Sequence, residues 1–260
     1  MLMDMKPILF NCPKEFDTVE VYPIHDVHYG NAQFDMNRWK KLKAEILAQP
    51  NRYCIFVGDL MEMAVPNSKS DMFSQTVPPD AQKEWISYEM GELKDRIIAV
   101  VSGNHEHNRA TKLCGLYPLY DACCWAKIQD KYRENFAAVD IGVGDRKCAG
   151  KQFHYVGFVT HKAKDMKNWS TADTIEGFDF LLYGHDHDPK EHARAHLVYD
   201  TKNKMVSTKC VETVNCGSFL TYGGYAARAP YRPPSDKMYK IILCPTKTRE
   251  KKIETVGFYL

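Results

Sequence analysis

The chain alternates short runs of apolar residues with segments whose apolar residues recur at helical spacing. The runs 19–25, 53–57 and 97–102 each have the length of a buried strand. Between them, apolar residues at steps of three and four predict helices after Asp35 and after Asp80, because either residue can cap a helix N-terminus. Strands that alternate with helices in this way indicate an α/β arrangement in the first half of the chain.

The second half of the chain follows a different pattern. Residues 116–133 have helical spacing, and the segments after them are strand-like and joined by short turns, so that several would pair antiparallel. These strand-like segments are 153–160, 178–183, 193–200, 205–213 and 238–244. Because no repeat, low-complexity tract or Gly/Ser linker divides the chain, we predict a single domain over residues 1–260, with mixed sheets and a strand-rich C-terminal part at 191–260.

Composition narrows the class of protein. The 260 residues are 44% hydrophobic and 26% charged, which is ordinary for a soluble globular protein and excludes disordered and fibrous classes. Lysine and arginine (35) nearly balance aspartate and glutamate (33), and a net charge of +2 is too small to predict a nucleic-acid or membrane partner by itself. The nine cysteines form no CxxC pair, and no apolar run approaches the ~18 residues that span a bilayer. Since no secretory signal is evident either, we predict reduced thiols, a cytoplasmic location and no membrane partner.

Side chains that can bind metal ions begin where the apolar runs stop. In chain order they are Asp26-Val27-His28, Gly58-Asp59, Gly103-Asn104-His105-Glu106, the lone His161, and Gly184-His185-Asp186-His187. Active sites of α/β proteins commonly lie at the carboxyl ends of strands. From this chain's own content of glycine, asparagine, histidine and acidic residues, a GNH[DE] motif is expected by chance only roughly 0.003 times and a GHxH motif roughly 0.02 times. The ordered set is therefore a strong signal.

This set resembles the calcineurin-like metallophosphoesterase superfamily, whose pattern is DxH, GD, GNH[DE], a lone histidine and GHxH, and the resemblance covers residues 20–190. It implies a two-sheet β-sandwich flanked by helices, a four-layer α/β/β/α fold, with a dinuclear metal centre at the strand ends. Transferred by motif, one set of metal ligands would be Asp26, His28 and His187, and the other would be Asn104, His161 and His185. Asp59 would bridge the two metals, and His105 would stand close to the reacting phosphate.

The residue types agree with that chemistry. Imidazole with carboxylate or amide oxygen suits Mn²⁺, Fe²⁺, Ni²⁺ or Zn²⁺, and we expect two divalent ions with Mn²⁺ as the first choice. Two cations about 3.5–4 Å apart need an anionic bridge such as Asp59, and a hydroxide shared by both could attack phosphorus in line. His105, if protonated, could donate to the leaving oxygen, and Glu106 could orient it or a neighbouring imidazole. Arg109 and Asn104 are candidates for binding the substrate phosphate.

Other residues have alternative interpretations. The assignment of His161 as a metal ligand depends on its place after a strand and on motif order. His154 is the alternative ligand in this region, although we interpret it as a strand-face residue. His25 is expected to face the core. Residues 222–240 interleave tyrosines with cations, as a nucleic-acid surface would, but a surface hairpin is the favoured interpretation. Residues 61–79 are a candidate loop over the site.

The predicted function is metal-dependent phosphodiester hydrolysis, with a nucleotide or nucleic acid as substrate, by direct attack of a metal-bridging hydroxide. A phosphomonoesterase with the same centre is the first alternative. A non-catalytic metal-binding scaffold is the second, and a nucleic-acid-binding protein without chemistry is the third. Residues 58–63 read Gly-Asp-Leu-Met-Glu-Met and lack the arginine of the GDxVDRG motif, which disfavours a protein phosphatase. Natural substrate and oligomeric state do not follow from the sequence.

Overall fold

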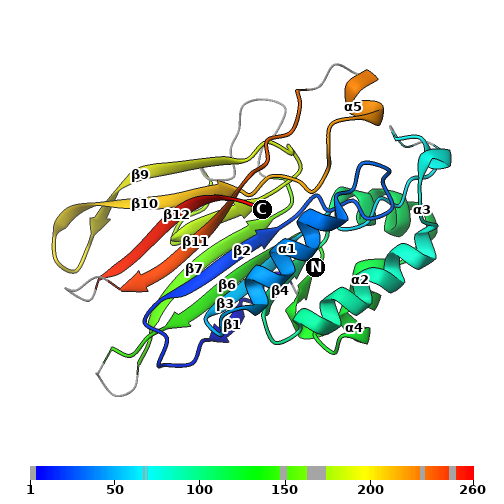
Figure 1. The fold of residues 1–260 in the computed structure, drawn as a ribbon. Coiled ribbons are helices and arrows are strands. Elements are labelled where there is room, and N and C mark those ends of the chain that lie inside the picture. Colours follow the sequence, from blue (N-terminus) through cyan, green and yellow to red (C-terminus); the bar gives the residue numbers. More distant parts are fainter. Residues whose placement is uncertain are drawn as a thin grey trace.

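The computed structural model describes residues 4–66, 68, 70–146, 151–162, 174–228, 232–245 and 250–260. Within these residues the strands form two sheets of six strands each, here called sheet A and sheet B (Figure 1). Both sheets contain parallel and antiparallel pairs, as predicted. The α/β sandwich with mixed sheets is thereby confirmed.

Sheet B carries the strands predicted in the first half of the chain. In order across the sheet, its members are β12 (Lys251–Tyr259), β11 (Lys237–Pro245), β2 (Val19–Ile24), β3 (Arg52–Val57), β4 (Ile97–Val101) and β5 (Tyr132–Arg133). From β2 to β5 all neighbours are parallel, whereas β11 and β12 add antiparallel pairs at one edge. Parallel strands need crossover connections, and helices supply two of these, between β2 and β3 and between β3 and β4.

Sheet A is built from the second half of the chain plus one N-terminal strand. Its order is β1 (Ile8–Asn11), β6 (Phe136–Val143), β7 (Phe153–Thr160), β8 (Phe180–Tyr183), β10 (Met205–Asn215) and β9 (Lys190–Asp200). The strand-rich part predicted at 191–260 therefore does not form a sheet of its own, because β9 and β10 complete sheet A whereas β11 and β12 complete sheet B.

The helices are few and short. They are α1 (Met36–Leu47), α2 (Pro79–Leu93), α3 (Lys112–Cys114), α4 (Pro118–Trp125), α5 (Gly224–Arg228), the 3₁₀ turns η1 (Met72–Ser74) and η3 (Gln129–Lys131), and the π-helix η2 (His105–Thr111). Figure 1 shows α1, α2 and α4 on the same side of the sandwich. Among the residues described, no helix is long and apolar enough to cross a membrane.

Two apolar layers hold these elements together. One lies between the two sheets and includes Ile55 of β3 and Tyr155 of β7. The other lies between sheet B and the helices, where Trp39 of α1 and Met90 of α2 pack with Phe56 of β3. Strand β3 is apolar on both faces because it is covered on both. Helices α1, α2 and α4 all contribute to the sheet B layer, so the outer face of sheet A is not covered by any of them.

Two local predictions differ from the structure. Asp35 caps α1 as predicted and accepts N–H groups of Asn37 and Arg38, but Asp80 lies in the first turn of α2, which begins at Pro79. Proline has no N–H group and a fixed φ that suit the first helical position, and this sets the helix start one residue earlier than Asp80 would.

The helix predicted over residues 116–133 is also interrupted. Helix α4 ends at Trp125, and Lys127 then has a left-handed φ of 60°, which a right-handed helix does not accommodate. The chain turns through η3 into β5, where Tyr132 pairs with Val100 of β4. Pairing with sheet B therefore overrides the helical spacing of this segment.

Candidate metal centre

The predicted site residues follow five strands that end at one edge of the sandwich. In sheet B, β2, β3 and β4 are parallel neighbours, and in sheet A so are β7 and β8. Carboxyl ends of parallel neighbours meet at the same edge of a sheet. The two edges are also joined, because the Nδ1–H of His161, after β7, donates to the carbonyl oxygen of Val57, the last residue of β3, at 2.8 Å. The fold thus brings all five motif groups together.

The backbone at these strand ends is strained. Five of the eight non-glycine residues that have positive φ in the described part of the chain belong to the site, with φ between 50° and 77°: Asp26, His28, Asp59, His185 and His187. A non-glycine residue in the left-handed region costs of order 1–3 kcal/mol, and such residues cluster at functional sites. The strain indicates that the required positions of the side chains determine these conformations, and not the intrinsic conformational preference of the backbone.

Two glycines let the loops after β3 and β4 touch. A Cβ on Gly103 would lie 2.1 Å from the backbone nitrogen of Asp59, and a Cβ on Gly58 would lie 2.5 Å from the Cα of Gly103. Neither distance is possible for real atoms. The glycines of the GD and GNHE motifs are therefore required for the close approach of the two loops.

The first cluster contains Asp26, His28 and His187, whose ligand atoms all lie within 4.8 Å of one another. The Nε2 atoms of the two histidines are 3.1 Å apart. Oδ1 of Asp26 lies 3.6 Å from Nε2 of His28 and 3.4 Å from Nε2 of His187. This oxygen is buried and has no hydrogen-bond partner. A buried carboxylate oxygen without a partner is costly, and a cation between these three side chains would satisfy it.

The other oxygen of Asp26 is firmly held. Oδ2 accepts the Nδ1–H of His25 at 2.6 Å and the backbone N–H of His185 at 2.8 Å. His25 is fully buried, and its Nε2 accepts the backbone N–H of Cys216 at 2.9 Å, which places the ring proton on Nδ1. His25 therefore lies in the core, as expected, but it also orients a predicted metal ligand.

The second cluster contains Asp59, His161 and His185, whose ligand atoms again lie within 4.8 Å of one another. Nε2 of His161 lies 3.2 Å from Oδ2 of Asp59 and 3.1 Å from Oδ1 of Asn104. Because Nδ1 of His161 donates to a backbone carbonyl, Nε2 is the ring atom that would bind a metal ion, after loss of its proton. These imidazole, carboxylate and amide donors can hold a divalent cation.

Asp59 lies between the two clusters. Its carboxylate lies within 4.8 Å of ligand atoms of His161 and His185. It also lies within 4.8 Å of ligand atoms of His28 and His105. Its Oδ1 accepts the backbone N–H of His105 at 2.7 Å, which orients the carboxylate between the two sets of histidines. This is the position that the sequence analysis assigns to a bridging ligand.

His154, the alternative to His161, lies away from the site. It stands near the start of β7 on the outer face of sheet A, where its Nδ1 contacts Oδ1 of Asp140 at 2.7 Å. His161 follows the other end of the same strand and is buried among the site residues. The interpretation of His154 as a strand-face residue agrees with this placement.

Glu106 acts on the backbone and not on an imidazole. Its buried carboxylate accepts N–H groups from Gly103 at 3.0 Å, Asp59 at 3.0 Å, Leu60 at 2.7 Å and Met61 at 3.0 Å. The prediction that it orients His105 or a neighbouring ring is therefore wrong, because four backbone donors surround it instead. It fixes the loop that carries Asp59.

Arg109 reaches the site but is bound to a residue that the motif analysis missed. Its Nη1 donates to the backbone oxygen of Glu62 at 2.5 Å and to Oε1 of Glu62 at 3.0 Å. Its Nη2 lies 2.9 Å from Nε2 of His105. Glu62 is buried and also lies 3.4 Å from Nδ1 of His28 and 3.8 Å from Nδ1 of His105. A glutamate within the apolar run Leu-Met-Glu-Met was the signal for it in the sequence.

Neighbouring charges hold the site carboxylates ionised. Burial opposes ionisation of Asp26, but the charges of His187 and His28 and the hydrogen bond from His25 outweigh it and hold the pKa of Asp26 well below its ordinary value. The pKa values of Asp59 and Glu62 are lowered for the same kind of reason, through the surrounding histidines. Three buried carboxylates therefore give the site the negative charge that divalent cations require.

The histidines divide into two groups. Burial lowers the pKa of His28 and His161, but hydrogen bonds and charges from Asp26 and Glu62 raise the pKa of His28 to about 10, and Asp59 raises that of His161 to about 9. Burial lowers the pKa of His105 to about 3, with His28 and Arg109 acting in the same direction. His105 is thus neutral in this structure, whereas its predicted role as an acid requires the protonated form.

The two segments with open interpretations have distinct structures. Residues 222–240 do not form the predicted surface hairpin, since α5 and the start of β11 fall within them, and Tyr239 is buried in the core between the sheets. Tyr231 lies outside the described residues. In the other segment, 61–79, the hydroxyl of Ser70 donates to Glu62 at 2.5 Å, so this loop is bound to the edge of the site.

Comparison with known proteins gives distant structural matches. No protein-family model and no curated protein matches the sequence. A conserved, predicted phosphoesterase from Streptococcus pneumoniae TIGR4 matches with 13% identity and a TM-score of 0.33 over 93% of this chain and 98% of that chain. Vps29 from Chaetomium thermophilum matches with 11% identity and a TM-score of 0.39 over 93% of this chain and 97% of that chain. The same Vps29 in complex with a cyclic peptide matches with 10% identity and a TM-score of 0.36 over 93% and 96% of the two chains.

The fold itself follows from the chain's own features. The two mixed six-stranded sheets lie against each other, and the DxH, GD, GNHE, histidine and GHxH groups meet at the carboxyl ends of their strands. The chain therefore has an α/β sandwich of two mixed sheets, with its motif groups at the strand ends, which is the arrangement that the resemblance to the calcineurin-like metallophosphoesterases implies.

Proposed function

We propose that this chain is a metal-dependent phosphoesterase that hydrolyses a phosphodiester of a nucleotide or nucleic acid. The observation that carries the proposal is the buried, unpartnered Oδ1 of Asp26, which faces His28 and His187 beside a second cluster of ligands. A structural role for this cluster would leave that oxygen unsatisfied, whereas a metal role satisfies it.

The ligand sets are assigned by cluster. Asp26, His28 and His187 would hold one cation, and Asn104, His161 and His185 would hold the other, with Asp59 between them. Two divalent cations, of which Mn²⁺ is our first choice and Fe, Ni or Zn the others, would supply Lewis-acid activation of water and neutralise charge on the phosphoryl oxygens.

His105 and Arg109 are the proposed substrate contacts. The Nη2 of Arg109 points at Nε2 of His105, so an anionic phosphoryl group beside His105 would also meet the guanidinium. Such an anion would raise the pKa of His105, because it offsets the positive charges of Arg109 and His28 that now lower it. His105 would then carry the proton that the leaving oxygen needs.

Glu62 is proposed as a positioning residue for this pair. It binds Arg109 through two hydrogen bonds and lies within ion-pair distance of both His28 and His105. Its charge compensates Arg109, so the guanidinium is kept in place before substrate arrives.

The proposal includes the cellular compartment in which the protein works. Burial raises the pKa of Cys12, Cys54 and Cys216 to about 12, which keeps these three side chains as unreactive thiols. All three are free cysteines, and we propose a cytoplasmic location on this basis.

The experiment compares a diester with a monoester. Metal-stripped protein is reconstituted with Mn²⁺ and assayed with bis-p-nitrophenyl phosphate and p-nitrophenyl phosphate. Asp59→Asn and His105→Ala are expected to abolish turnover, and Asp121→Asn and His192→Ala, which replace exposed residues of the same types, serve as matched controls.

Each outcome of this assay favours one of the three candidate functions. Faster cleavage of the diester, lost in the two site variants alone, supports the phosphodiesterase. Preference for the monoester replaces it with a phosphomonoesterase. Two bound metal ions per chain without turnover of either ester would favour the non-catalytic scaffold.

A further inference from the structure

Strand β9 forms an open edge of sheet A. It runs over 11 residues, Lys190–Asp200, and pairs with β10 along its whole length. In the part of the chain that the structure describes, no strand follows β9 in the sheet and no backbone hydrogen bond reaches its other side. Figure 1 shows the β9–β10 hairpin at the edge of the sandwich. A strand edge of this kind presents N–H and C=O groups to another strand.

The register of β10 identifies which residues of β9 point outward. The backbone N–H of Glu212 in β10 donates at 3.1 Å to the oxygen of Asp179, which immediately precedes β8. Because successive residues of a strand bond to opposite sides, Val211 points to β9 instead, and so does Arg194 of β9, with which it pairs, point to β10. The residues of β9 whose N–H and C=O groups point outward are therefore Glu191, Ala193, Ala195, Leu197 and Tyr199.

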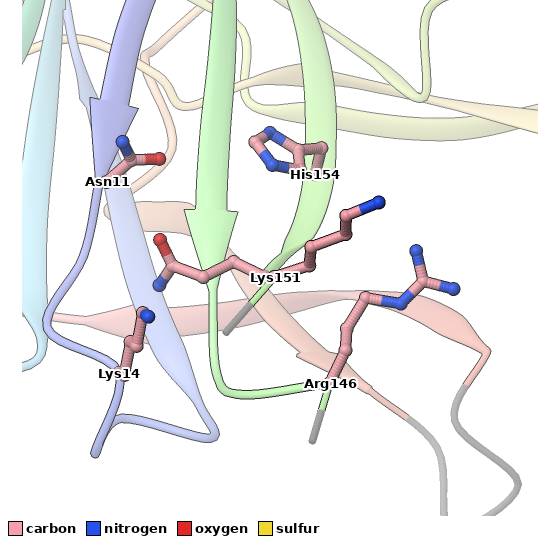
Figure 2. Close-up of a pocket in the computed structure, with 6 residues that line it drawn as sticks. Asn11, Lys14, Arg146, Lys151 and His154 are labelled. Atoms are coloured by element: carbon pink, nitrogen blue, oxygen red, sulfur yellow. The ribbon is translucent and has the colours of Figure 1, made fainter. Parts of the chain in front are cut away.

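Strand β9 has none of the backbone features that block pairing at a sheet edge. Proline, a bulge or a very short strand commonly serves this purpose. β9 contains no proline, and its register with β10 is unbroken. At the other edge of sheet A, β1 has only four residues and Lys14 follows it, beside the pocket of Figure 2 that Asn11 and Lys14 help to line. Of these two edges, β9 is the one suited to a partner strand.

Large apolar side chains are exposed along the same hairpin. Leu197 is 80% exposed, Tyr199 is 56% exposed, and Val206 of β10 is 62% exposed. Tyr199 and Val206 form a cross-strand pair, and Leu197 shares their face because residues two apart in a strand point to the same side. Apolar side chains that gather beside an open edge are typical of an interaction surface.

The outward residues are arranged symmetrically about Ala195. If β9 of a second copy runs antiparallel with Ala195 opposite Ala195, then Leu197 faces Ala193 and Tyr199 faces Glu191. Each large apolar side chain thus meets a small or a polar one. The outward N–H and C=O groups of the two strands coincide in this register, and they would form about ten backbone hydrogen bonds.

The ends of β9 carry opposite charges that suit the same pairing. Lys190 begins the strand and Asp200 ends it, so this register places each Lys190 opposite Asp200 of the other copy. Opposite charges in a cross-strand pair are stabilising, whereas an in-register parallel copy would place Lys190 beside Lys190. Lys190 also contacts Asp188 of its own chain at 2.8 Å, but its side chain is half exposed and can reach a second carboxylate.

We propose that two copies of this chain pair through β9, antiparallel and centred on Ala195, to form a dimer in which sheet A continues from one copy into the other. The two-fold arrangement occupies the open edge of both copies, so the assembly closes at two chains. Leu197 of each copy covers Ala193 of the other and loses exposed apolar surface. Pairing at this edge does not depend on the proposed hydrolysis, because β9 carries none of the ligand candidates.

Sedimentation equilibrium of the full chain over a wide range of concentration measures the dissociation constant of the dimer. A reductant is present, since the exposed Cys114, Cys124 and Cys210 could otherwise cross-link copies. We expect a reversible dimer. Ala195→Pro removes an outward N–H from each copy but no bond to β10, so it should raise the dissociation constant at least roughly tenfold through two lost hydrogen bonds. Ala195→Ser keeps the N–H and should leave the dimer unchanged.

Two further pairs of variants test the side chains. Leu197→Lys should weaken the dimer, whereas Leu9→Lys, at an exposed leucine of the other edge strand, should not. Lys190→Glu places a glutamate opposite Asp200 twice in each dimer, so it should raise the dissociation constant roughly tenfold, and by more at low salt. Lys41→Glu, at an exposed position of α1, changes the net charge equally and should have no effect.

Three results would overturn the proposal. These are a chain that stays monomeric at every concentration, a dimer that both Ala195→Pro and Leu197→Lys leave intact, and a dimer that Leu9→Lys dissociates. The first would leave the edge of β9 to a strand of a different protein, and the third would move the interface to β1. Urea unfolding of each variant establishes that loss of the dimer occurs in a folded chain.

Discussion

The carboxylate of Glu106 accepts the backbone N–H of Asp59 at 3.0 Å, although the two residues lie 47 positions apart in the chain. The same carboxylate accepts three further N–H groups, two of them from Leu60 and Met61. One buried side chain thus holds the loop that places the central carboxylate of the site.

Glu106→Gln is expected to destabilise the protein and weaken metal binding. The amide replaces one acceptor oxygen with an NH₂ group that faces backbone donors, and each hydrogen bond to a charged group contributes about 1.5–3 kcal/mol. We expect a loss of at least about 2 kcal/mol in urea unfolding and a lower affinity for Mn²⁺ in calorimetry. Glu84→Gln, on the exposed face of α2, should change neither, and equal behaviour of the two variants would contradict the role of Glu106.

His25→Phe is expected to reduce the affinity for one of two metal ions. A planar aromatic ring is kept, but Asp26 loses a 2.6 Å hydrogen bond and Cys216 loses its acceptor. Loss of such a partner of a metal ligand typically costs 10–100-fold in affinity. A calorimetric Mn²⁺ titration should show one weakened and one unchanged site. Two unchanged sites would mean that His25 serves the core alone.

Gly103→Ala is expected to separate the loops after β3 and β4. The new Cβ would lie 2.1 Å from the backbone nitrogen of Asp59, so the loop must move and Asp59 must move with it. We expect metal content to fall below two ions per chain. Gly115→Ala is the control, since Gly115 has a φ of +68° but nothing within 4 Å of its Cβ position, and it should cost about 1 kcal/mol without loss of metal.

The metal-free protein is expected to be most stable near pH 6.5. The pKa of His28 is raised to about 10 and that of His161 to about 9, so their contribution is complete below the unfolded value of 6.5 and is lost as pH rises through 9 and 10. The pKa of His105 is lowered to about 3, so its cost grows as pH falls from 6.5 towards 3. The lowered pKa values of Asp59 and Glu62 remove further stability in acid.

Urea unfolding in EDTA over pH 4 to 10 measures this profile. Metal loading should remove the alkaline decline, because a histidine bound to a cation carries no proton to lose. An alkaline arm that persists unchanged with bound metal would show that the site histidines do not produce it.

Local patterns predicted much of the fold. The apolar runs at 53–57 and 97–102 became β3 and β4, and Asp35 became the cap of α1, because buried strands and helix caps depend on residues within a few positions. The start of α2 and the end of α4 were less predictable, since Pro79 competes with Asp80 and pairing of Tyr132 with Val100 overrides helical spacing.

The residues of the candidate site also fall into two groups, those that a local sequence pattern predicts and those that it does not. The ligand candidates are named by their motifs, and parallel strands bring them together without further information. The residues that hold them could not be found this way. His25 contacts Cys216, which lies 191 positions away, and Glu62 contacts Arg109, which lies 47 positions away. The apolar run around Glu62 indicates that it is buried, but no local pattern specifies either contact.

Five ligand candidates have a left-handed backbone conformation, which affects how this chain would respond to laboratory evolution. They are Asp26, His28, Asp59, His185 and His187. Glycine adopts that conformation without penalty, so glycine at any of these positions would relieve strain while it removed a ligand. Where the relieved strain exceeds the side-chain contacts that are lost, selection for heat resistance alone would therefore enrich glycine, and such variants would bind metal less well. A selection that includes a metal-dependent readout would retain all five.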